Sequence, residues 1–329
     1  MRSDGDARVS RPGAPRLVLA GNANVDVLLG PVTPWPRPGT EVLAERFEWR
    51  VGGMLGNAAQ ALASLGVLTT LVWDVGDDVM GAWLRSALAA AGDAPRVLPG
   101  ATSVTVGLGH PGGERTFVSH LGHLARSEPD ALAAAIKAAA PGDHLLVGGS
   151  FLLPRWRDAL PGLLELARGR GVVTALDTGW PTEGWSEGVR AELAAALAHV
   201  DLYLPNLDEA RGLTGLADAD PGTVALALDA LVAGTSVIKL GADGAAYREG
   251  DRLHVVAAPR VEPVDTVGAG DTFDAALLAG RLAGWGWRRA VIAAVAMASL
   301  TITTAPRHYP TAADLARAAV LAPDAFTRS

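Results

Sequence analysis

The sequence predicts an α/β fold in which a mostly parallel central sheet is covered by helices on both faces. Short runs of strand character alternate with amphipathic helical patterns from residue 17 almost to the end of the chain. This alternation is typical of βαβ units, in which a helix connects two parallel strands. Two extended segments, at 40–51 and 102–118, fall outside the alternation, and we expect them to pair into a separate small sheet. We find no internal repeat or linker that would divide the chain into independent domains.

The expected strands are short runs that are either apolar throughout or alternate apolar with polar side chains. They lie at 17–20, 40–51, 68–73, 96–98, 103–107, 114–118, 144–147, 172–176, 202–204 and 237–240. The expected helices carry apolar residues at spacings of three and four, and Gly66 is placed to end the first of them. These helices begin near residues 55, 79, 129, 155, 188, 206, 271 and 290.

Composition excludes several classes of protein. The chain has 329 residues, of which 49% are hydrophobic and 19% charged, and its formal net charge is −7. A nucleic-acid-binding protein would show a basic face. The absence of cysteine excludes disulfides, thiol catalysis and cysteine-ligated metals. Residues 1–15 read as a disordered tail without a secretory signal, and no apolar run is long enough to cross a bilayer. We therefore expect a cytoplasmic protein without nucleic-acid or membrane partners.

A glycine loop that opens a helix is the most informative stretch. Gly268, Ala269 and Gly270 lead directly into Asp271, and apolar residues then recur at helical spacing from Phe273. The free N–H groups and positive dipole of a helix start bind anions, and glycine lets the backbone approach a phosphate. A carboxylate beside such a loop suits a base that takes a proton from an attacking hydroxyl, and the dipole should favour its ionised form. An ordinary helix cap is the alternative, and this stretch by itself leaves both interpretations open.

Polar residues after the first strand form a second candidate site. Asn24 and Asp26 alternate with an apolar residue, so both side chains can point to one side, where they would suit sugar hydroxyls. An Asx turn is the alternative. Gly52 and Gly53 precede a helix that carries Asn57. Adjacent glycines at that place indicate either close backbone contact with a ligand or only a sharp turn.

Two further patterns concern metal and nucleotide. Asn206 and Glu209 lie three residues apart at a helix start, where an amide and an acid suit a hydrated Mg²⁺, but a capping box uses the same residues. Gly241 and Gly244 follow the strand that ends near Lys239, and they either flank a nucleotide or only form a turn. The chain has no Gly-Lys dipeptide and therefore no Walker P-loop. Any phosphate must accordingly be bound by the glycine loop described above.

Together these segments resemble the ribokinase–fructokinase (phosphofructokinase-B type) family of carbohydrate kinases, from about residue 17 to 320. The double glycine resembles the N-terminal signature of that family, and the stretch that begins at Asp265 and Thr266 resembles its C-terminal signature. The resemblance implies a ribokinase-like three-layer α/β/α domain over 16–329, with a small β-sheet lid formed by about 32–51 and 101–120. It also implies a homodimer that forms through this lid.

The resemblance implies a role for each motif residue. Asp271 would be the catalytic base, and Gly268, Ala269 and Gly270 would form the anion hole. The residues implied for substrate binding are Asn24, Asp26, Gly52, Gly53 and Asn57. Those implied for ATP binding are Asn206, Glu209, Lys239, Gly241, Gly244, Asp265 and Thr266, with Glu209 reaching Mg²⁺ through water. A monovalent cation is left open as a further cofactor.

This chain departs from the family pattern in three ways. Met54 occupies the place of a lysine that follows the double glycine in ribokinases, which makes ribose a less favoured acceptor. The segment 304–310 replaces a glycine-containing turn, and arginines such as Arg115 must supply any positive charge of the lid. The leading interpretation is an ATP- and Mg²⁺-dependent kinase that acts on a hydroxymethyl group of a sugar or sugar-like acceptor. A nucleoside kinase and a non-catalytic ligand-binding protein on the same fold are the alternatives.

Overall fold

The computed structural model describes residues 15–111 and 115–320. The tail expected at 1–15 lies, apart from Pro15, outside these described residues. Within them, the main sheet has eight strands in the order β14–β13–β12–β11–β10–β9–β1–β4. Their bounds are β1 Leu17–Gly21, β4 Thr69–Val72, β9 His144–Gly148, β10 Val173–Asp177, β11 Leu202–Tyr203, β12 Thr235–Lys239, β13 Ala245–Glu249 and β14 Arg252–Val256.

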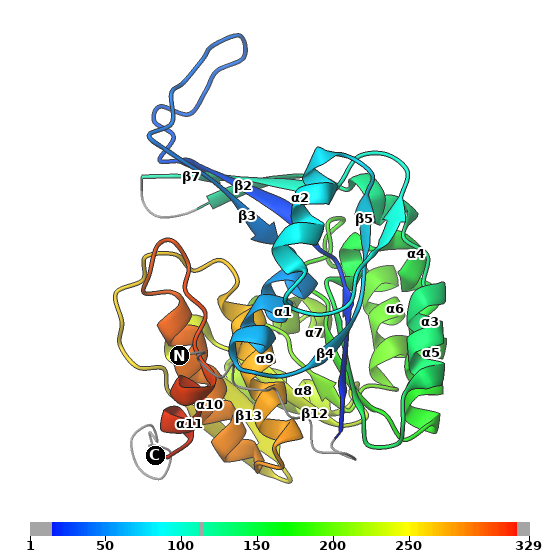
Figure 1. Cartoon of the computed structure of the whole chain (residues 1–329). Helices are drawn as coiled ribbons and strands as arrows, with labels where there is room; N and C mark the ends of the chain where they lie inside the picture. Colours follow the sequence, from blue (N-terminus) through cyan, green and yellow to red (C-terminus); the bar gives the residue numbers. More distant parts are fainter. Residues whose placement is uncertain (1–14, 112–114, 321–329) are drawn as a thin grey trace, which may run out of the picture.

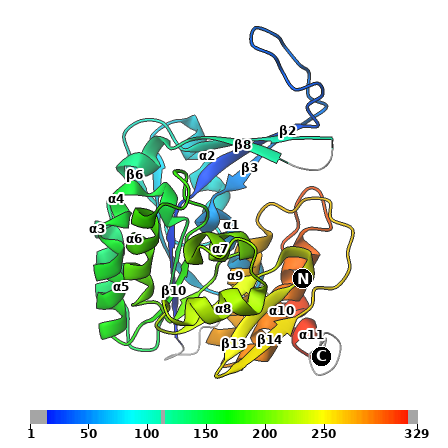
Figure 2. The same ribbon diagram turned by 180° about the vertical axis from the view of Figure 1, so that it is seen from behind.

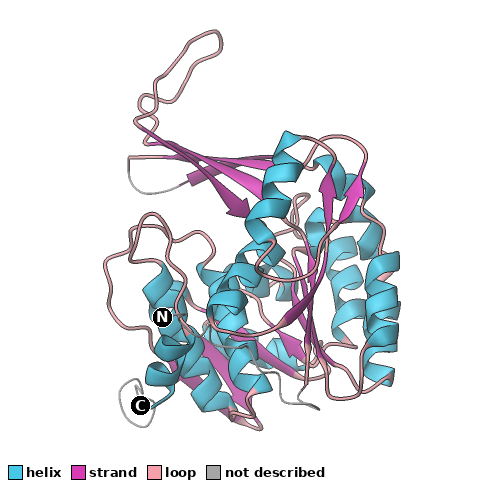
Figure 3. Ribbon diagram, viewed as in Figure 1, coloured by secondary structure: helices cyan, strands magenta, loops and turns pink. Residues whose placement is uncertain are grey.

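The main sheet is mostly parallel, as expected from the alternation of strands and helices. Every neighbouring pair from β4 to β12 is parallel, and only β13 and β14 join in antiparallel fashion at one edge. The short hairpin turns between β12, β13 and β14 explain that edge, because tight turns can only connect antiparallel strands. Figure 3 shows the strands lying between helices, which confirms the predicted three-layer α/β/α architecture.

Each face of the main sheet carries its own layer of helices (Figures 1 and 2). On one face lie α1 Met54–Ser64, α2 Val79–Leu88, α9 Ala269–Leu282, α10 Trp287–Thr301 and α11 Ala312–Val320. On the other lie α3 Asp130–Ala138, α5 Leu160–Gly169, α6 Glu187–Leu197, α7 Leu207–Thr214 and α8 Pro221–Asp229. The short α4, Pro154–Arg157, precedes α5.

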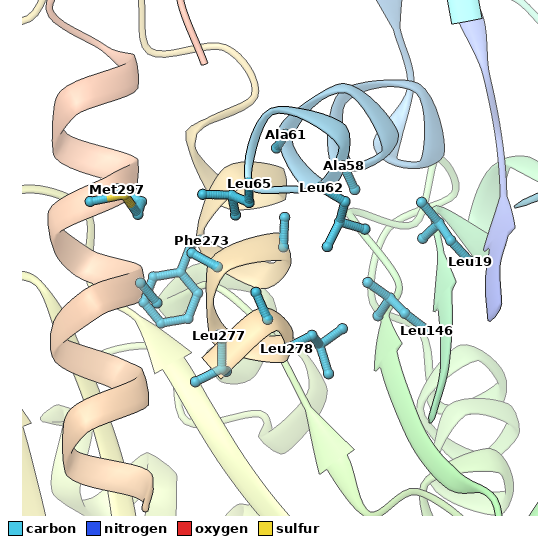
Figure 4. Packing of buried hydrophobic residues seen from close by; sticks show 14 of the residues in the cluster. Leu19, Ala58, Ala61, Leu62, Leu65, Leu146, Phe273, Leu277, Leu278 and Met297 are labelled. Carbon is cyan, nitrogen blue, oxygen red and sulfur yellow. The ribbon is translucent and has the colours of Figure 1, made fainter. Parts of the chain in front are cut away.

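Apolar side chains from the sheet and from α1 and α9 make the first of these cores. Leu19 and Leu146 of the sheet meet Leu62 of α1 together with Phe273 and Leu278 of α9 (Figure 4). All five side chains are buried, and burial of a Leu or Phe side chain contributes about 1.5–3 kcal/mol. This packing fixes the start of α9 relative to the carboxyl ends of the strands.

A separate small sheet has the strand order β3–β2–β7–β8. Its bounds are β2 Asn24–Gly30, β3 Arg46–Gly52, β7 Val104–Gly109 and β8 Arg115–His120. The predicted hairpin is therefore present, but the sheet is centred on β2, which was not among the expected strands. The strand expected from residue 40 begins only at Arg46. The prolines of segment 31–38 cannot donate ladder hydrogen bonds, and the chain there forms a loop that projects from the molecule (Figure 1).

Three other expectations need correction. The helix expected from residue 155 is divided into α4 and α5, because Pro161 is accommodated in the first turn of α5 rather than in a helix interior. The strand at 96–98, β6 Arg96–Leu98, pairs with β5 Asp74–Gly76 in a two-stranded sheet outside the main one. Helices α8 and α11 lie outside those expected from the sequence. Among the described residues, no helix combines the length and apolarity needed to cross a membrane.

Candidate active site

The glycine loop begins α9 as the sequence predicts. Gly268 is the N-cap with a φ of 80°, a left-handed conformation that favours glycine, and no side chain caps the helix there. A Cβ at Gly268 would lie 2.6 Å from Nη1 of Arg307, so this guanidinium group would have to shift to admit a side chain. The first N–H groups of α9 are thus left without a capping side chain. Such groups are available to an anion.

Asp271 lies in the first turn of α9 and points toward α1. Its Oδ2 accepts a hydrogen bond of 2.7 Å from Nδ2 of Asn57. Burial, and then the neighbouring Asp177 carboxylate, raise the pKa of Asp271 to about 7, against the hydrogen bond from Asn57. The helix dipole was expected to favour the ionised form of Asp271 and so to lower its pKa. That expectation is wrong, because burial raises the pKa. A pKa near neutrality is nevertheless well suited to a general base.

A buried lysine lies directly beneath the glycine loop. Nζ of Lys239 donates to Oδ2 of Asp177 at 2.8 Å and to both carboxylate oxygens of Asp274 at 3.2 Å. Although burial alone would lower the pKa of Lys239, the two carboxylates raise it, so the lysine stays charged. A Cβ at Gly270 would lie 3.5 Å from the same Nζ. Lys239, expected to contact ATP, thus has two carboxylate partners and lies close to the loop.

Asn206 and Glu209 form the capping box that the sequence left as an alternative. The Glu209 N–H donates to Oδ1 of Asn206, and the Asn206 N–H donates to Oε2 of Glu209, both at 2.8 Å. Glu209 also lines a polar cavity of about 340 Å³ together with Asp177 and Asp271. Burial, and then the charge of Asp177, raises the pKa of Glu209 to about 7.

The residues around this cavity fit a hydrated Mg²⁺ ion. Within the described part of the chain, no group of three or more His, Asp or Glu side chains is arranged to hold a metal by itself. Mg²⁺ is usually bound by one or two carboxylates, with waters and substrate phosphates completing its shell. Glu209, which lines the cavity together with Asp177 and Asp271, meets that requirement.

A second cavity, of about 670 Å³, adjoins the first, and Lys239, Gly241 and Gly270 line both. We call it the nucleotide cavity, after the ligand that is expected at its glycines from the sequence. Gly270 and Thr266 line one end of it, and Gly241 and Gly244 line another part. Its remaining walls are largely apolar, with Phe273, Val295, Ala298 and Ile302 among them. Gly244 also has a local role, since a Cβ there would lie 1.9 Å from the carbonyl oxygen of Val256 at a φ of 100°.

The candidate substrate residues of the N-terminal part lie together at the junction between the two sheets. Nδ2 of Asn24 donates to Oδ1 of Asp26 at 2.7 Å, and both side chains are buried in β2, which excludes the Asx turn. A Cβ at Gly52 would lie 2.1 Å from Oδ1 of Asp26, and one at Gly53 would lie 2.7 Å from Oδ1 of Asn24. The double glycine is therefore required by close contact with the protein's own polar side chains.

Asp265 has an environment that the sequence does not indicate. Its carboxylate accepts a hydrogen bond from Nη1 of Arg50 and lies 2.9 Å from Nη2 of Arg115 and 4.0 Å from Nη2 of Arg307. Although burial alone would raise the pKa of Asp265, the hydrogen bond and charge of Arg50, the N–H of Val267 and the charge of Arg115 lower it to about 2. We expected Asp265 to contact ATP, but it is not one of the described residues that line the nucleotide cavity.

Several residues of the site were missed by sequence reasoning. Asp177 ends a parallel strand and Asp274 lies one helical turn after Asp271, and those positions were usable signals. Arg50 and Arg307 carried no such signal, because each lies far in sequence from the carboxylate that it contacts. Thus Asp271 is hydrogen-bonded to Asn57 and also lines one cavity with Glu209 and Lys239. Asn24 and Asp26 lie together at the double glycine that precedes the helix of Asn57.

Comparisons with known proteins identify the family of this chain. The sequence profile described as pfkB family carbohydrate kinase matches residues 15–310. A ribokinase of Haemophilus influenzae is 23% identical over 87% of this chain and 92% of its own length. A 1-phosphofructokinase of Rhodobacter capsulatus is 31% identical over 72% of this chain and 74% of its own length.

Solved structures show the same fold. The ribokinase of Arabidopsis thaliana, solved with ribose and ATP, superposes with a TM-score of 0.77 at 23% identity, covering 93% of this chain and 99% of that one. The phosphofructokinase-2 of Escherichia coli, solved with potassium, superposes with a TM-score of 0.76 at 22% identity. The match covers 94% of this chain and 100% of that one. The expected ribokinase-like fold and family are confirmed: the chain belongs to the pfkB family of carbohydrate kinases.

Proposed function

We propose that the protein transfers the γ-phosphate of ATP to a hydroxymethyl group of a sugar or sugar-like acceptor, with Asp271 as the base. The observation that carries this proposal is the position of Asp271 in the first turn of α9. It lies beside uncapped helix N–H groups, has a pKa near neutrality, directly follows Gly270 at the nucleotide cavity, and is hydrogen-bonded to Asn57. ATP as the donor is supported by the Arabidopsis neighbour, which was solved with ATP.

The proposed chemistry is positioning combined with electrostatic stabilisation. The Asp271 carboxylate accepts the proton of the acceptor hydroxyl, while the N–H groups of Gly268, Ala269 and Gly270 stabilise charge on the transferring phosphoryl group. Asn57 holds the carboxylate in place through its 2.7 Å hydrogen bond. Lys239, buried under Gly270, adds a positive charge close to the loop.

The nucleotide is proposed to bind in the 670 Å³ cavity, with the adenine against its apolar walls and the phosphates directed toward Gly270. Thr266, Gly241 and Gly244 line this cavity and accord with the roles inferred from the sequence. Glu209, with the capping Asn206, would hold Mg²⁺ through water in the adjoining polar cavity. When bound, the ion would neutralise charge on the triphosphate.

The small sheet is proposed to act as a lid and as a dimer interface. Leu29↔Phe47, Val27↔Trp49 and Val106↔Val118 are paired across its strands, so Phe47, Trp49 and Val118 lie on one face. Their exposed fractions are 67%, 41% and 61%. An exposed apolar face of this kind is typical of an interaction surface. Light scattering of purified protein tests this: a dimer that Val118→Lys converts to a monomer supports the interface.

The test of the function is a coupled ATP-consumption assay over ketoses, aldoses, sugar acids, sugar phosphates and nucleosides. We expect Mg²⁺-dependent ATP consumption with a sugar or sugar-like acceptor, and a product that carries the phosphate on a primary hydroxyl. Preference for a nucleoside would support the nucleoside-kinase alternative. Binding of sugars without turnover of any acceptor would support the non-catalytic alternative.

A further inference from the structure

Three guanidinium groups converge on a single carboxylate next to the candidate active site. Arg50 comes from β3, Arg115 from β8, and Arg307 from the segment between α10 and α11, and all three have Asp265 as a charged partner. The side chains of Arg50 and Arg307 are only 11% and 5% exposed, so this positive charge is largely removed from water. Glu48 adds one further carboxylate, 3.5 Å from Arg50, and that carboxylate also pairs with Arg46.

Arg50 and Arg307 each leave part of their hydrogen-bonding capacity unused within the described residues. Nε and Nη2 of Arg50, and Nε and Nη2 of Arg307, are buried and have no hydrogen-bond partner among the described residues. Buried polar groups are normally paired, and a buried charged donor without a partner is especially costly. Arginine offers a planar fork of N–H donors that matches the oxygens of a carboxylate or a phosphate. These four nitrogen atoms, with six N–H groups between them, can therefore bind a group that has several acceptor oxygens.

The position of the arginines identifies which reactant would bring those oxygens. Nη1 of Arg307 donates to Oδ1 of Asn57 at 2.8 Å, and Asn57 in turn donates to Asp271. Arg50 of β3 is paired with Asp26 of β2, so the two side chains lie on the same face of the small sheet. Among the described residues that line the nucleotide cavity and the polar cavity at Glu209, none of the three arginines occurs. The unused donors thus lie on the acceptor side of the loop.

We propose that the acceptor is an anionic sugar derivative, with a carboxylate or a phosphate that is bound by Arg50 and Arg307 and supported by Arg115. This inference rests on the proposed kinase function and narrows its substrate class. Asp265 holds one edge of the guanidinium groups and thereby orients their remaining donors. Arg307 would bind the anion while keeping Asn57 against the base. A neutral sugar would leave the buried donors unpaired, and sites built to hydrogen-bond a group discriminate strongly against analogues that lack it.

The first experiment compares neutral and anionic members of matched pairs with the wild-type protein. The probes are glucose against gluconate, and fructose against fructose 1-phosphate and fructose 6-phosphate. We expect an anionic member to exceed its neutral parent in kcat/KM by at least about a hundredfold, and the pair that shows this distinguishes carboxylate from phosphate. Phosphorylation of a neutral sugar with equal or greater kcat/KM would overturn the inference while leaving the proposed function intact.

Binding is measured separately by calorimetry without ATP, so that the inference is tested even if no probe turns over. Binding of gluconate or a fructose phosphate, with at least about tenfold weaker binding of the neutral parent, supports the anion site. If such binding occurs without any turnover, the anion site is supported and the proposed kinase function is what fails. If no anionic probe binds more tightly than its parent, the inference is overturned.

Variants then assign the binding to the arginines. Arg50→Gln and Arg307→Gln should each weaken binding of the anionic probe by at least about tenfold and leave that of the neutral parent within twofold. Arg46→Gln is the matched control, because Arg46 lies on the same strand as Arg50, is half exposed, and has Glu48 as its ion-pair partner among the described residues. A purely structural role of the arginines would lower the melting temperature and leave the ratio of anionic to neutral affinity unchanged. That result would overturn the assignment, and the wild-type comparison remains decisive if a variant does not fold.

Discussion

The amide Nδ2 of Asn57 donates a hydrogen bond of 2.7 Å to Oδ2 of Asp271, across 214 residues of sequence. This contact joins the helix after the double glycine to the first turn of the helix after the glycine loop. Both helices pack in one apolar core, which holds the two side chains in register (Figure 4). The proposed base is thus oriented by a neighbour that is itself hydrogen-bonded to Arg307.

Removing this hydrogen bond should change the pH dependence of the reaction. The bond from Asn57 lowers the pKa of Asp271 against the effect of burial. In Asn57→Ala the pKa of Asp271 should therefore rise, and the acidic limb of kcat/KM should move to higher pH. Gln60→Ala is the control, because Gln60 lies on the same helix and contacts Tyr309 rather than Asp271. A limb that moves to lower pH, or equally in both variants, would contradict the assigned role of Asn57.

The raised pKa of Asp271 also predicts a pH dependence of stability. Its pKa is about 7 in the folded protein and close to 3.8 when unfolded, so the folded state binds more protons between these values. The free energy of unfolding should accordingly fall as pH rises from about 4 to 7, since ionising the buried group is costly. Asp271→Asn cannot ionise, so it should melt at a higher temperature than wild type at pH 8 and at a similar one near pH 4. Equal melting temperatures at pH 8 would contradict the burial argument.

Glu209→Gln separates a metal role from a capping role. Glutamine preserves the capping box, so the fold should remain intact. If Glu209 orients hydrated Mg²⁺, the variant should need more Mg²⁺ for half-maximal rate and turn over more slowly. Asp208→Asn is the control, because this neighbouring side chain is 81% exposed in the same helical turn. If the Mg²⁺ dependence is unchanged and stability falls by about 1 kcal/mol or less, Glu209 has a capping role and no metal role.

Gly268→Ala tests the geometry of the glycine loop. The variant should suffer both the cost of a left-handed backbone, about 1–2 kcal/mol, and a clash with Arg307. Gly284→Ala is the matched control, because its φ of 77° is similar and a Cβ there would meet nothing within 4 Å. We expect turnover to fall only in Gly268→Ala, with the larger loss of stability. Equal effects on stability and rate in the two variants would contradict a specific role for the loop.

The parts of the molecule that could be predicted from sequence depend on local patterns. The alternation of strands and helices predicted the main sheet, and the spacing of Gly268, Gly270 and Asp271 predicted the loop that opens α9. The Asn206–Glu209 pair was recognisable in the same way as a helix start. Helix α8 had an available signal, since Asp220 caps it directly before Pro221.

The remaining features arise from tertiary contacts that no local pattern contains. Lys239 forms ion pairs with Asp177 and Asp274, which lie 62 and 35 residues away in the sequence. The pKa of Asp271 depends on burial, which the assembled core provides. The pairing of β2 with β3 and β7 depends likewise on distant strands. The convergence of Arg50, Arg115 and Arg307 on Asp265 follows from that pairing and could not be read from spacing.

The turnover of Asp271→Asn tests the central claim most directly. Asparagine keeps the size of the side chain and removes the base, and loss of a positioned base costs about 10² to 10⁴ in rate. The measurement is the single-turnover rate of phosphoryl transfer with a verified acceptor, alongside calorimetric affinities for ATP and that acceptor. We predict near-native affinities and a rate at least about a hundredfold lower. A rate close to that of wild type would contradict the assignment of Asp271 as the base and the mechanism built on it.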